Sequence, residues 1–470
     1  MADDLVFATI SELNAKLQKR EVSAVELTRV YLDRLERLGP QYNALALSFR
    51  KPALKQAKYI DRDFKIERFR GPLQGIPFGV KDLLSVAGYP TTWGAKPYAT
   101  QVFDETATVV KKLEKTGAIL IGKLAMVELA GGGGYRYPSA SLTGPGLNPW
   151  NRERWSGGSS SGSGAAVAAG MVGFALGSET SGSILTPSAY CGVTGLRPTY
   201  GLVSRAGAMA LSWTLDKIGP MCRSAQDCGH VLEVIAGADR ADPGSAGKSF
   251  YYTPQYARDF KDVRIGFAPA DFDVLAEPST RAAFNEALTV VKGLGMQVAE
   301  ASLPDFPYSA LTGTIIASEA ASIFEQLIAS GRVDELADQR QAQGLKAALE
   351  IPAKDYLRAM RIRTLVQDAL KDVFSNFDIL VAPSRYTAAT KITDPLDRST
   401  NTPGRPKGMS GLVACGNLAG LPALSLPCGF ADGMPVALQL VGRPFSENLL
   451  LKVGAEFQAR TDWHRRRPAV

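Results

Sequence analysis

Serine and glycine are concentrated in two short stretches of this 470-residue chain. The first, residues 157–164, leads into an alanine-rich helical segment, and the second spans residues 177–188. A phosphate-binding loop would need the lysine of GxxxxGK[ST], and a dinucleotide fold would need GxGxxG directly after a strand; neither pattern fits. Consecutive small residues instead let backbone N–H groups converge on one point, as an oxyanion hole requires. Ser183, in the second stretch, is therefore a candidate nucleophile.

Histidine is too scarce to be the expected base, since only His230 and His464 occur. Lys81 instead ends an apolar segment, residues 75–80, that is typical of a buried strand. Burial disfavours the ammonium form, so a lysine in this position can lose its proton and activate a serine. The other interpretation of Lys81 is an ion pair with its neighbour Asp82 at an exposed strand end.

Three segments resemble, in order and spacing, the signature of the amidase signature family of serine hydrolases. They are GGSSSGSGAAVAAG from residue 157, SETSGSILTPSAYCGVTGLRPTYG from residue 178, and LDKIGPMCRSAQDC from residue 215. GIPFGVKD upstream and PVALQLVGRPFSENLLL near the end match the family's flanking segments. The resemblance covers essentially the whole chain. It implies an α/β fold with a large mixed, mostly parallel central β-sheet covered by helices on both faces.

The resemblance also implies a proton relay. Lys81 corresponds to the family's lysine, Ser159 to its bridging serine on a cis peptide, and Ser183 to its nucleophile. Neutral Lys81 would take a proton from Ser159, and Ser159 one from Ser183, which attacks a carbonyl to form an acyl-enzyme. The backbone N–H groups of the implied oxyanion hole belong to Thr180, Ser181, Gly182 and Ser183. No metal and no cofactor is expected.

The second stretch departs from the family's common pattern T-D-T-G-G-S-I-R at positions around the candidate nucleophile. This chain has Glu179 for the aspartate, Ser181 for the first glycine and Leu185 for the arginine. Ser181 is acceptable only if its backbone does not need a positive φ. Leu185 removes a charge near the nucleophile and, in the resemblance, the partner of Glu179. We therefore expect a less polar pocket than in relatives that bind a carboxylate or a polar amide.

Aromatic residues near the signature segments are candidates for lining the substrate pocket. Tyr135, Tyr137 and Trp213 are the expected substrate-binding residues, although large aromatic side chains are more often part of the core. Asp216 is expected to orient the scaffold rather than to act as a base.

Composition limits the class of protein. The chain is 45% hydrophobic and 21% charged, with a formal net charge of +7, a mild excess that does not by itself predict nucleic-acid binding. Its five cysteines form no CxxC pair, so neither a disulfide framework nor a zinc site is indicated. We find no signal-peptide pattern, and the longest apolar stretch, residues 164–177, is too short to span a membrane. The expectation is a cytoplasmic protein of unpredicted oligomeric state, with a small amide and water as substrates.

Strand-like and helical segments alternate along the chain, as in α/β folds. Expected strands are 75–80, 118–121, 174–176, 263–267, 378–382, 422–427 and 436–441. Expected helices begin near Ile10 and after Ser23, and others span 107–116, 281–294, 356–374 and 447–459. We predict a single domain, 1–470, with a helical N-terminal arm (1–60), a catalytic signature core (70–230) and a remainder (231–470) that completes the sheet and the substrate pocket.

The leading functional prediction is a stand-alone amidase. It would hydrolyse small or medium amides, including aryl amides, as an aryl acylamidase does, with side activity on carbamates (a urethanase) or esters, because all present a carbonyl to the same oxyanion hole. The first alternative is the A subunit of a tRNA-dependent amidotransferase, a glutaminase that works in a complex. The second is a non-catalytic binding protein on an amidase scaffold, and a nucleotide-binding protein is the weakest.

Overall fold

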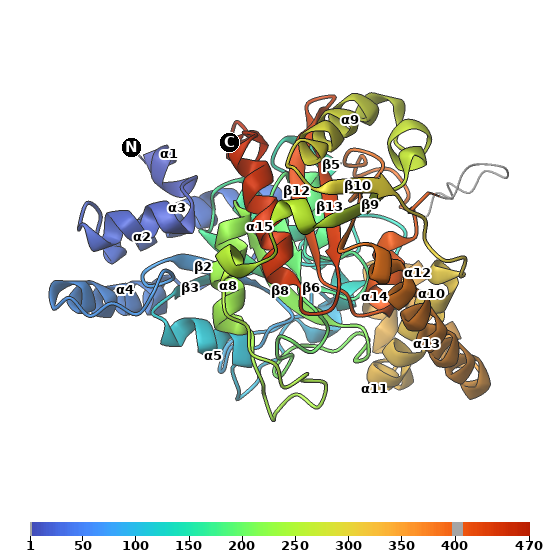
Figure 1. Ribbon diagram of the computed structural model, residues 1–470. Coiled ribbons are helices and arrows are strands. Elements are labelled where there is room, and N and C mark those ends of the chain that lie inside the picture. The colour runs from blue at the N-terminus through green and yellow to red at the C-terminus, as the bar shows by residue number, and fades with distance from the viewer. Residues whose placement is uncertain (1, 397–407) are drawn as a thin grey trace.

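A long β-sheet runs through the molecule, and helices pack around it (Figure 1). The computed structural model describes residues 2–396 and 408–470. The strands are β1 (Leu45–Ser48), β2 (Pro77–Lys81), β3 (Ile119–Leu124), β4 (Leu147–Asn148), β5 (Asn151–Trp155), β6 (Phe174–Glu179), β7 (Thr194–Arg197), β8 (Lys217–Cys222), β9 (Arg264–Phe267), β10 (Gln297–Glu300), β11 (Ile379–Pro383), β12 (Ala423–Ala431) and β13 (Met434–Gly442).

The α-helices differ widely in length and lie mostly between the strands in sequence. They are α1 (Ala2–Val6), α2 (Ile10–Gln18), α3 (Ala24–Leu38), α4 (Arg50–Lys65), α5 (Thr108–Lys115), α6 (Ser161–Ala168), α7 (Leu185–Cys191), α8 (Ala225–Ile235), α9 (Pro278–Lys292), α10 (Tyr308–Ile323), α11 (Glu325–Ala329), α12 (Gln339–Ala348), α13 (Ala353–Asn376), α14 (Leu412–Leu418) and α15 (Glu447–Ala459).

Within the described residues, the main sheet has 11 strands in the order β1-β3-β2-β6-β8-β7-β12-β13-β11-β9-β10, and β4 and β5 form a separate pair. The α/β fold with a large mixed sheet is therefore confirmed. Parallel pairs form two groups, β3-β2-β6 and β11-β9-β10, and the strands between these groups are antiparallel. The parallel part is smaller than expected, because β12 and β13 are joined by a tight hairpin rather than by a crossover helix.

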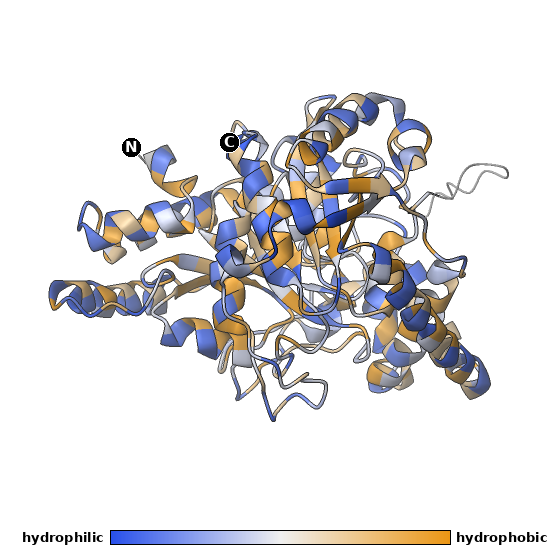
Figure 2. Ribbon diagram, viewed as in Figure 1, coloured by the Kyte–Doolittle hydropathy of each residue, from blue (hydrophilic) through white to orange (hydrophobic). Residues whose placement is uncertain are grey.

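Helices cover both faces of the central sheet. Successive residues of a strand point to opposite faces, and every residue of β2, β3, β6, β8 and β13 is buried. Helices α8 and α15 pack against each other and against β8 and β12, and both lie in front of the sheet in Figure 1. Figure 2 shows apolar residues along the central strands, whereas the outer helices carry apolar and polar residues in alternation.

Local sequence explains the elements that were predicted. Helix α3 begins after Ser23, whose hydroxyl and the Glu26 carboxylate form the expected capping box. The predicted strands and helices all occur, with shifts of a few residues at their ends, and helix α15 has the predicted bounds. All five cysteines lie in the described part of the chain and are free and buried. In that part, no helix is long and apolar enough to cross a membrane. The division into an arm, a core and a remainder stays a prediction.

The topology brings the two signature stretches to Lys81. Strands β2 and β6 are neighbours and parallel, so their carboxyl ends lie at the same edge of the sheet. Lys81 is the last residue of β2, and β6 leads directly into the loop of residues 180–184. The first stretch ends in α6, which packs against β2 and β6. Strand pairing therefore places a lysine and two serine-rich segments together.

Candidate active site

Lys81 lies at the centre of the candidate site and is completely buried. Its Nζ is 2.7 Å from Ser159 Oγ and 2.9 Å from Ser178 Oγ. The peptide bond between Gly158 and Ser159 is cis, as the resemblance implies. The alternative interpretation, an ion pair of Lys81 with Asp82, is wrong, because Asp82 pairs with the buried Lys123 at 2.7 Å.

Burial lowers the pKa of Lys81 to about 7, although the negative charges of Asp216 and Glu179 partly oppose this shift. An ordinary lysine, with a pKa near 10.5, is almost entirely charged at neutral pH. A substantial fraction of Lys81 is therefore neutral near pH 7, and a neutral amine can accept a proton from a serine hydroxyl.

Ser183 lies in the loop between β6 and α7 and retains a small exposed fraction of 8%. The backbone N–H of Ser160 donates to the Ser183 carbonyl oxygen at 3.3 Å, which ties the nucleophile candidate to the segment that carries Ser159. Gly182 has a φ of 89°, whereas Ser181 is not among the residues with positive φ. The loop therefore needs glycine at position 182 but not at 181, which explains how Ser181 is accommodated.

Glu179 fixes the conformation of this loop. One carboxylate oxygen accepts the backbone N–H groups of Ile184 and Leu185, at 2.9 and 3.0 Å. The other accepts from Arg197 at 2.8 Å and from Asn417 at 2.9 Å. Burial favours the neutral acid, but Arg197 and these hydrogen bonds outweigh it and hold the pKa of Glu179 at about 2. Leu185 therefore does not leave Glu179 unpaired: Arg197, from strand β7, is its partner.

We predict that Glu179→Gln lowers the free energy of unfolding by about 3 to 5 kcal/mol near pH 7, because it leaves the buried Arg197 without a compensating charge. Urea denaturation measures this loss, and Glu153→Gln, at an exposed position of β5, is the matched control. The pKa of Glu179 is depressed by folding, so its contribution is present above about pH 4.5 and is lost as the pH falls toward about 2. The wild type and Glu179→Gln should therefore have similar free energies of unfolding in acid. Equal free energies of unfolding of these two proteins at pH 7 would show that the Glu179–Arg197 ion pair does not hold the loop.

Asp216 has the orienting contacts that were expected. Its carboxylate accepts from Thr180 Oγ1 at 2.6 Å and from the backbone N–H groups of Leu211 and Ser212. Burial raises the pKa of Asp216, and these hydrogen bonds oppose the rise. The residue thus links the loop of Ser183 to the segment that carries Trp213.

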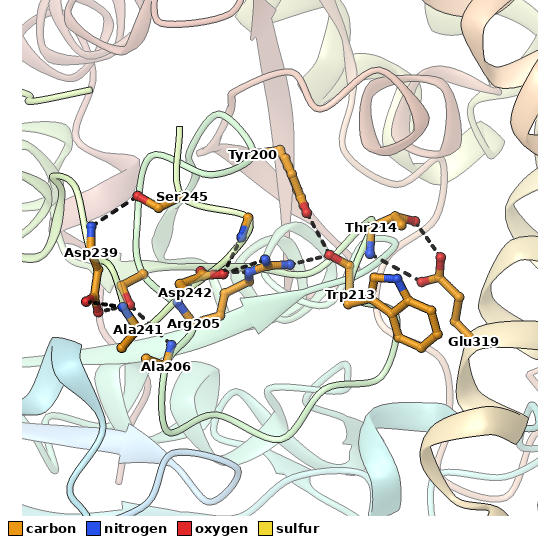
Figure 3. A network of polar contacts seen from close by, with 12 residues as sticks. Tyr200, Arg205, Ala206, Trp213, Thr214, Asp239, Ala241, Asp242, Ser245 and Glu319 are labelled. Carbon is orange, nitrogen blue, oxygen red and sulfur yellow. Dashed lines mark hydrogen bonds and ion pairs between the residues drawn. The ribbon is translucent and has the colours of Figure 1, made fainter. Parts of the chain in front are cut away.

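A cavity of about 200 Å³ lies beside this site. Ser178, Thr180 and Trp213 line it, together with apolar side chains such as Leu83 and Met209. Figure 3 shows how the wall around Trp213 is held: Arg205 and Tyr200 donate to the Trp213 carbonyl oxygen, and Arg205 forms an ion pair with Asp242 at 2.7 Å.

The three aromatic candidates lie in different places. Trp213 is 41% exposed and lines the cavity. The Tyr135 hydroxyl oxygen lies 3.2 Å from where a Cβ on Gly158 would be, next to Ser159. Tyr137 is at the surface, stacked against Arg136, and none of its described contacts reaches Lys81, Ser159 or Ser183. Contact of these rings with a substrate stays a prediction.

Several residues of the site were not found by sequence reasoning. Ser178 is a second partner of Lys81, and it carried a signal, since it lies in the second small-residue stretch. Asn417 and Arg385 come from distant segments with no recognisable motif, and Arg385 Nε donates to Thr186 Oγ1 at 2.9 Å. In the described ranges, no group of three or more histidine, cysteine, aspartate or glutamate side chains is arranged to hold a metal ion.

Comparison with known proteins identifies the class to which this fold and site belong. Residues 26–451 match the Amidase family model, and the chain belongs to that family. It is thus an enzyme of the class that hydrolyses carbon–nitrogen bonds of amides.

Individual relatives refine this assignment. The chain is 38% identical, over 99% of both sequences, to the A subunit of the glutamyl-tRNA(Gln) amidotransferase of Chloroflexus aggregans. It superposes on the native peptide amidase of Stenotrophomonas maltophilia with a TM-score of 0.84 at 30% identity, covering 98% of both chains. With the A subunit of the glutamyl-tRNA(Gln) amidotransferase of Thermotoga maritima the TM-score is 0.76 at 28% identity, covering 97% of this chain and 96% of that one.

These relatives correct the leading functional prediction. We expected a stand-alone amidase, but similarity over the full chain at 38% identity is to the A subunit of an amidotransferase, which was the first alternative. The hydrolase and amidase assignments hold, whereas the finer activities of an aryl acylamidase or a urethanase are not confirmed.

Proposed function

We propose that the chain is the glutamine-hydrolysing A subunit of a tRNA-dependent amidotransferase, and that it acts in a complex with partner subunits. The observation that carries this proposal is the full-length similarity to the A subunit of a glutamyl-tRNA(Gln) amidotransferase, at 38% identity over 99% of both chains. The buried lysine beside two serine-rich segments supplies the chemistry that glutamine hydrolysis needs.

The proposed reaction begins with proton transfer along the relay. Neutral Lys81 accepts the proton of Ser159, Ser159 accepts that of Ser183, and Ser183 Oγ attacks the side-chain amide carbon of glutamine. The relay then runs in reverse: Ser159 donates one proton to the amide nitrogen as the C–N bond breaks, and Lys81 returns its proton to Ser159. Protonation is needed because an amide anion is a very poor leaving group. Ammonia leaves, and a glutamyl ester remains on Ser183. Water, deprotonated by the relay, then attacks this ester and releases glutamate.

Backbone N–H groups in the loop of residues 180–183 would stabilise the negative oxygen of each tetrahedral intermediate. Asp216 binds Thr180 at the start of this loop, and Glu179 binds the backbone N–H groups of Ile184 and Leu185 at its end. The donors of the loop are therefore oriented before the substrate arrives. A preorganised donor of this kind contributes about 3 kcal/mol to transition-state stabilisation in other hydrolases. The roles of Lys81, Ser159 and Ser183 and of these donors are part of the proposal.

The proposal is tested by measuring ammonia release from glutamine, by the chain alone and together with the proteins that co-purify with it. Ser183→Ala is the matched inactive control, and an anilide and a carbamate are tested on the same preparations. We expect glutamine to be the best substrate and the partners to increase its turnover. Hydrolysis of the anilide or the carbamate, with no ammonia released from glutamine in either preparation, would contradict the proposal.

A further inference from the structure

Arg385 lies against the loop that carries Ser183, although it comes from the segment after strand β11. Its Nε is 2.9 Å from Thr186 Oγ1, and its Nη2 donates to the same oxygen. A Cβ on Gly182 would lie 2.8 Å from Arg385 Nη2. The guanidinium group is therefore in direct contact with the nucleophile loop, and glycine at position 182 leaves room for it.

This guanidinium has no counter-ion among residues 2–396 and 408–470. The other arginines around the site are paired with carboxylates, Arg197 with Glu179 and Arg205 with Asp242. The hydrogen bonds of Arg385 go to the neutral hydroxyl of Thr186. A guanidinium has five N–H donors, and its planar fork matches a carboxylate. A half-buried arginine that is held in place but not neutralised has donors available for an anion.

Tyr135 is a second side chain that lies beside the candidate catalytic segments. Burial raises the pKa of Tyr135, and the positive charge of Arg385 opposes that rise. The Tyr135 hydroxyl also lies beside Gly158. Arg385 and Tyr135 thus border the same region as the segments that carry Ser159 and Ser183.

The position of Arg385 is relevant because this chain has a leucine, Leu185, where the family's common pattern has an arginine. The family's common pattern has an arginine at that position, but here a buried leucine, 1% exposed, occupies it. Arg385 contacts Thr186, the next residue, from a segment 199 positions away. A positive charge is therefore present at this loop, but it comes from another part of the chain.

We propose that Arg385, with Thr186 and Tyr135, forms a subsite that binds a carboxylate of the substrate. The inference rests on the proposed function, since glutamine carries a carboxylate at the end of its chain opposite the amide. An arginine at the loop of the nucleophile would fix that end while the amide lies at Ser183. The site would then select amides whose acyl part ends in a carboxylate over neutral amides of the same length.

The test compares two linear amides of equal length, glutaramate, which ends in a carboxylate, and valeramide, which ends in a methyl group. Binding of each to the full chain is measured by calorimetry in the Ser183→Ala background, so that turnover is not required. The ratio of KM values in the active chain is the second readout. Arg385→Gln removes the charge, Arg385→Lys keeps it without the fork, and Arg358→Gln, on the exposed part of α13, is the matched control.

We expect the chain to prefer glutaramate, and Arg385→Gln to reduce this preference by about 10- to 100-fold, mainly through binding and KM. Arg385→Lys should retain part of the preference, and Arg358→Gln all of it. Equal affinity for the two amides in the parent, or an equal effect of Arg385→Gln on both, would overturn the subsite.

The outcomes for the subsite and for the proposed function are separable. If glutamine is not hydrolysed but the preference for glutaramate depends on Arg385, the subsite stands and the glutaminase assignment fails. If glutamine is hydrolysed and Arg385→Gln leaves the preference unchanged, the subsite fails and the glutaminase assignment stands.

Discussion

Ser183→Ala should abolish glutamine hydrolysis, with a loss of about 10⁴-fold or more, while the chain stays folded. The reason is that the relay would have no nucleophile to activate, and the remaining loop could stabilise an oxyanion only for direct attack by water. Ammonia release measures the loss. Intact-mass analysis after treatment with a fluorophosphonate should find a single adduct on the wild type and none on the variant.

The matched control is Ser181→Gly, which places the family's common residue two positions before Ser183. Ser181 is not held at a positive φ, so glycine can adopt its conformation, and we expect turnover within a few-fold of wild type. Substantial turnover by Ser183→Ala, or an adduct that persists in this variant, would assign the nucleophile to another residue.

Much of the fold could be predicted from local patterns. The capping box at Ser23 and the apolar segment before Lys81 each specify one element through short-range chemistry, and both elements form. Strand β8 was not predicted, because it contains Gly219 and Pro220, residues that normally argue against a central strand. It nevertheless lies between β6 and β7, with Pro220 opposite Leu176. Tertiary pairing overrides the local preference there.

Only part of the candidate site could be predicted from the sequence. Lys81, Ser159 and Ser183 lie in recognisable motifs, so the contact of Lys81 with Ser159, and the backbone contact of Ser183 with the segment that carries Ser159, could be expected from the resemblance. The residues that contact Glu179 and Thr186 in and beside the nucleophile loop could not be predicted. Arg197, Asn417 and Arg385 come from distant segments and reach these residues only when the chain has folded. Spacing in a single sequence carries no signal for contacts between positions so far apart.

Because such distant contacts cannot be predicted from the sequence, we expected a less polar pocket. Considered alone, Leu185 indicates that the nucleophile loop has lost its positive charge. In the folded chain, Arg197 neutralises Glu179, and the guanidinium of Arg385 lies against the same loop. A positive charge therefore lies at this loop although Leu185 carries none.

Lys81→Met should reduce glutamine turnover by about 10²- to 10⁴-fold, the usual contribution of a positioned base. Methionine preserves most of the apolar stem of the lysine but cannot accept the proton of Ser159. The matched control is Lys111→Met, which removes an exposed lysine from α5. We expect full activity in this control.

The pH profile assigns the base more directly than the loss of rate. Burial lowers the pKa of Lys81 to about 7, and the relay needs the neutral amine, so the rate should be constant above this pH and fall tenfold for each pH unit below it. Asp216 opposes the shift because its negative charge favours the ammonium. Asp216→Asn should therefore move the midpoint of the acidic limb to lower pH. If the residual activity of Lys81→Met kept the wild-type midpoint, the titrating group would be a residue other than Lys81.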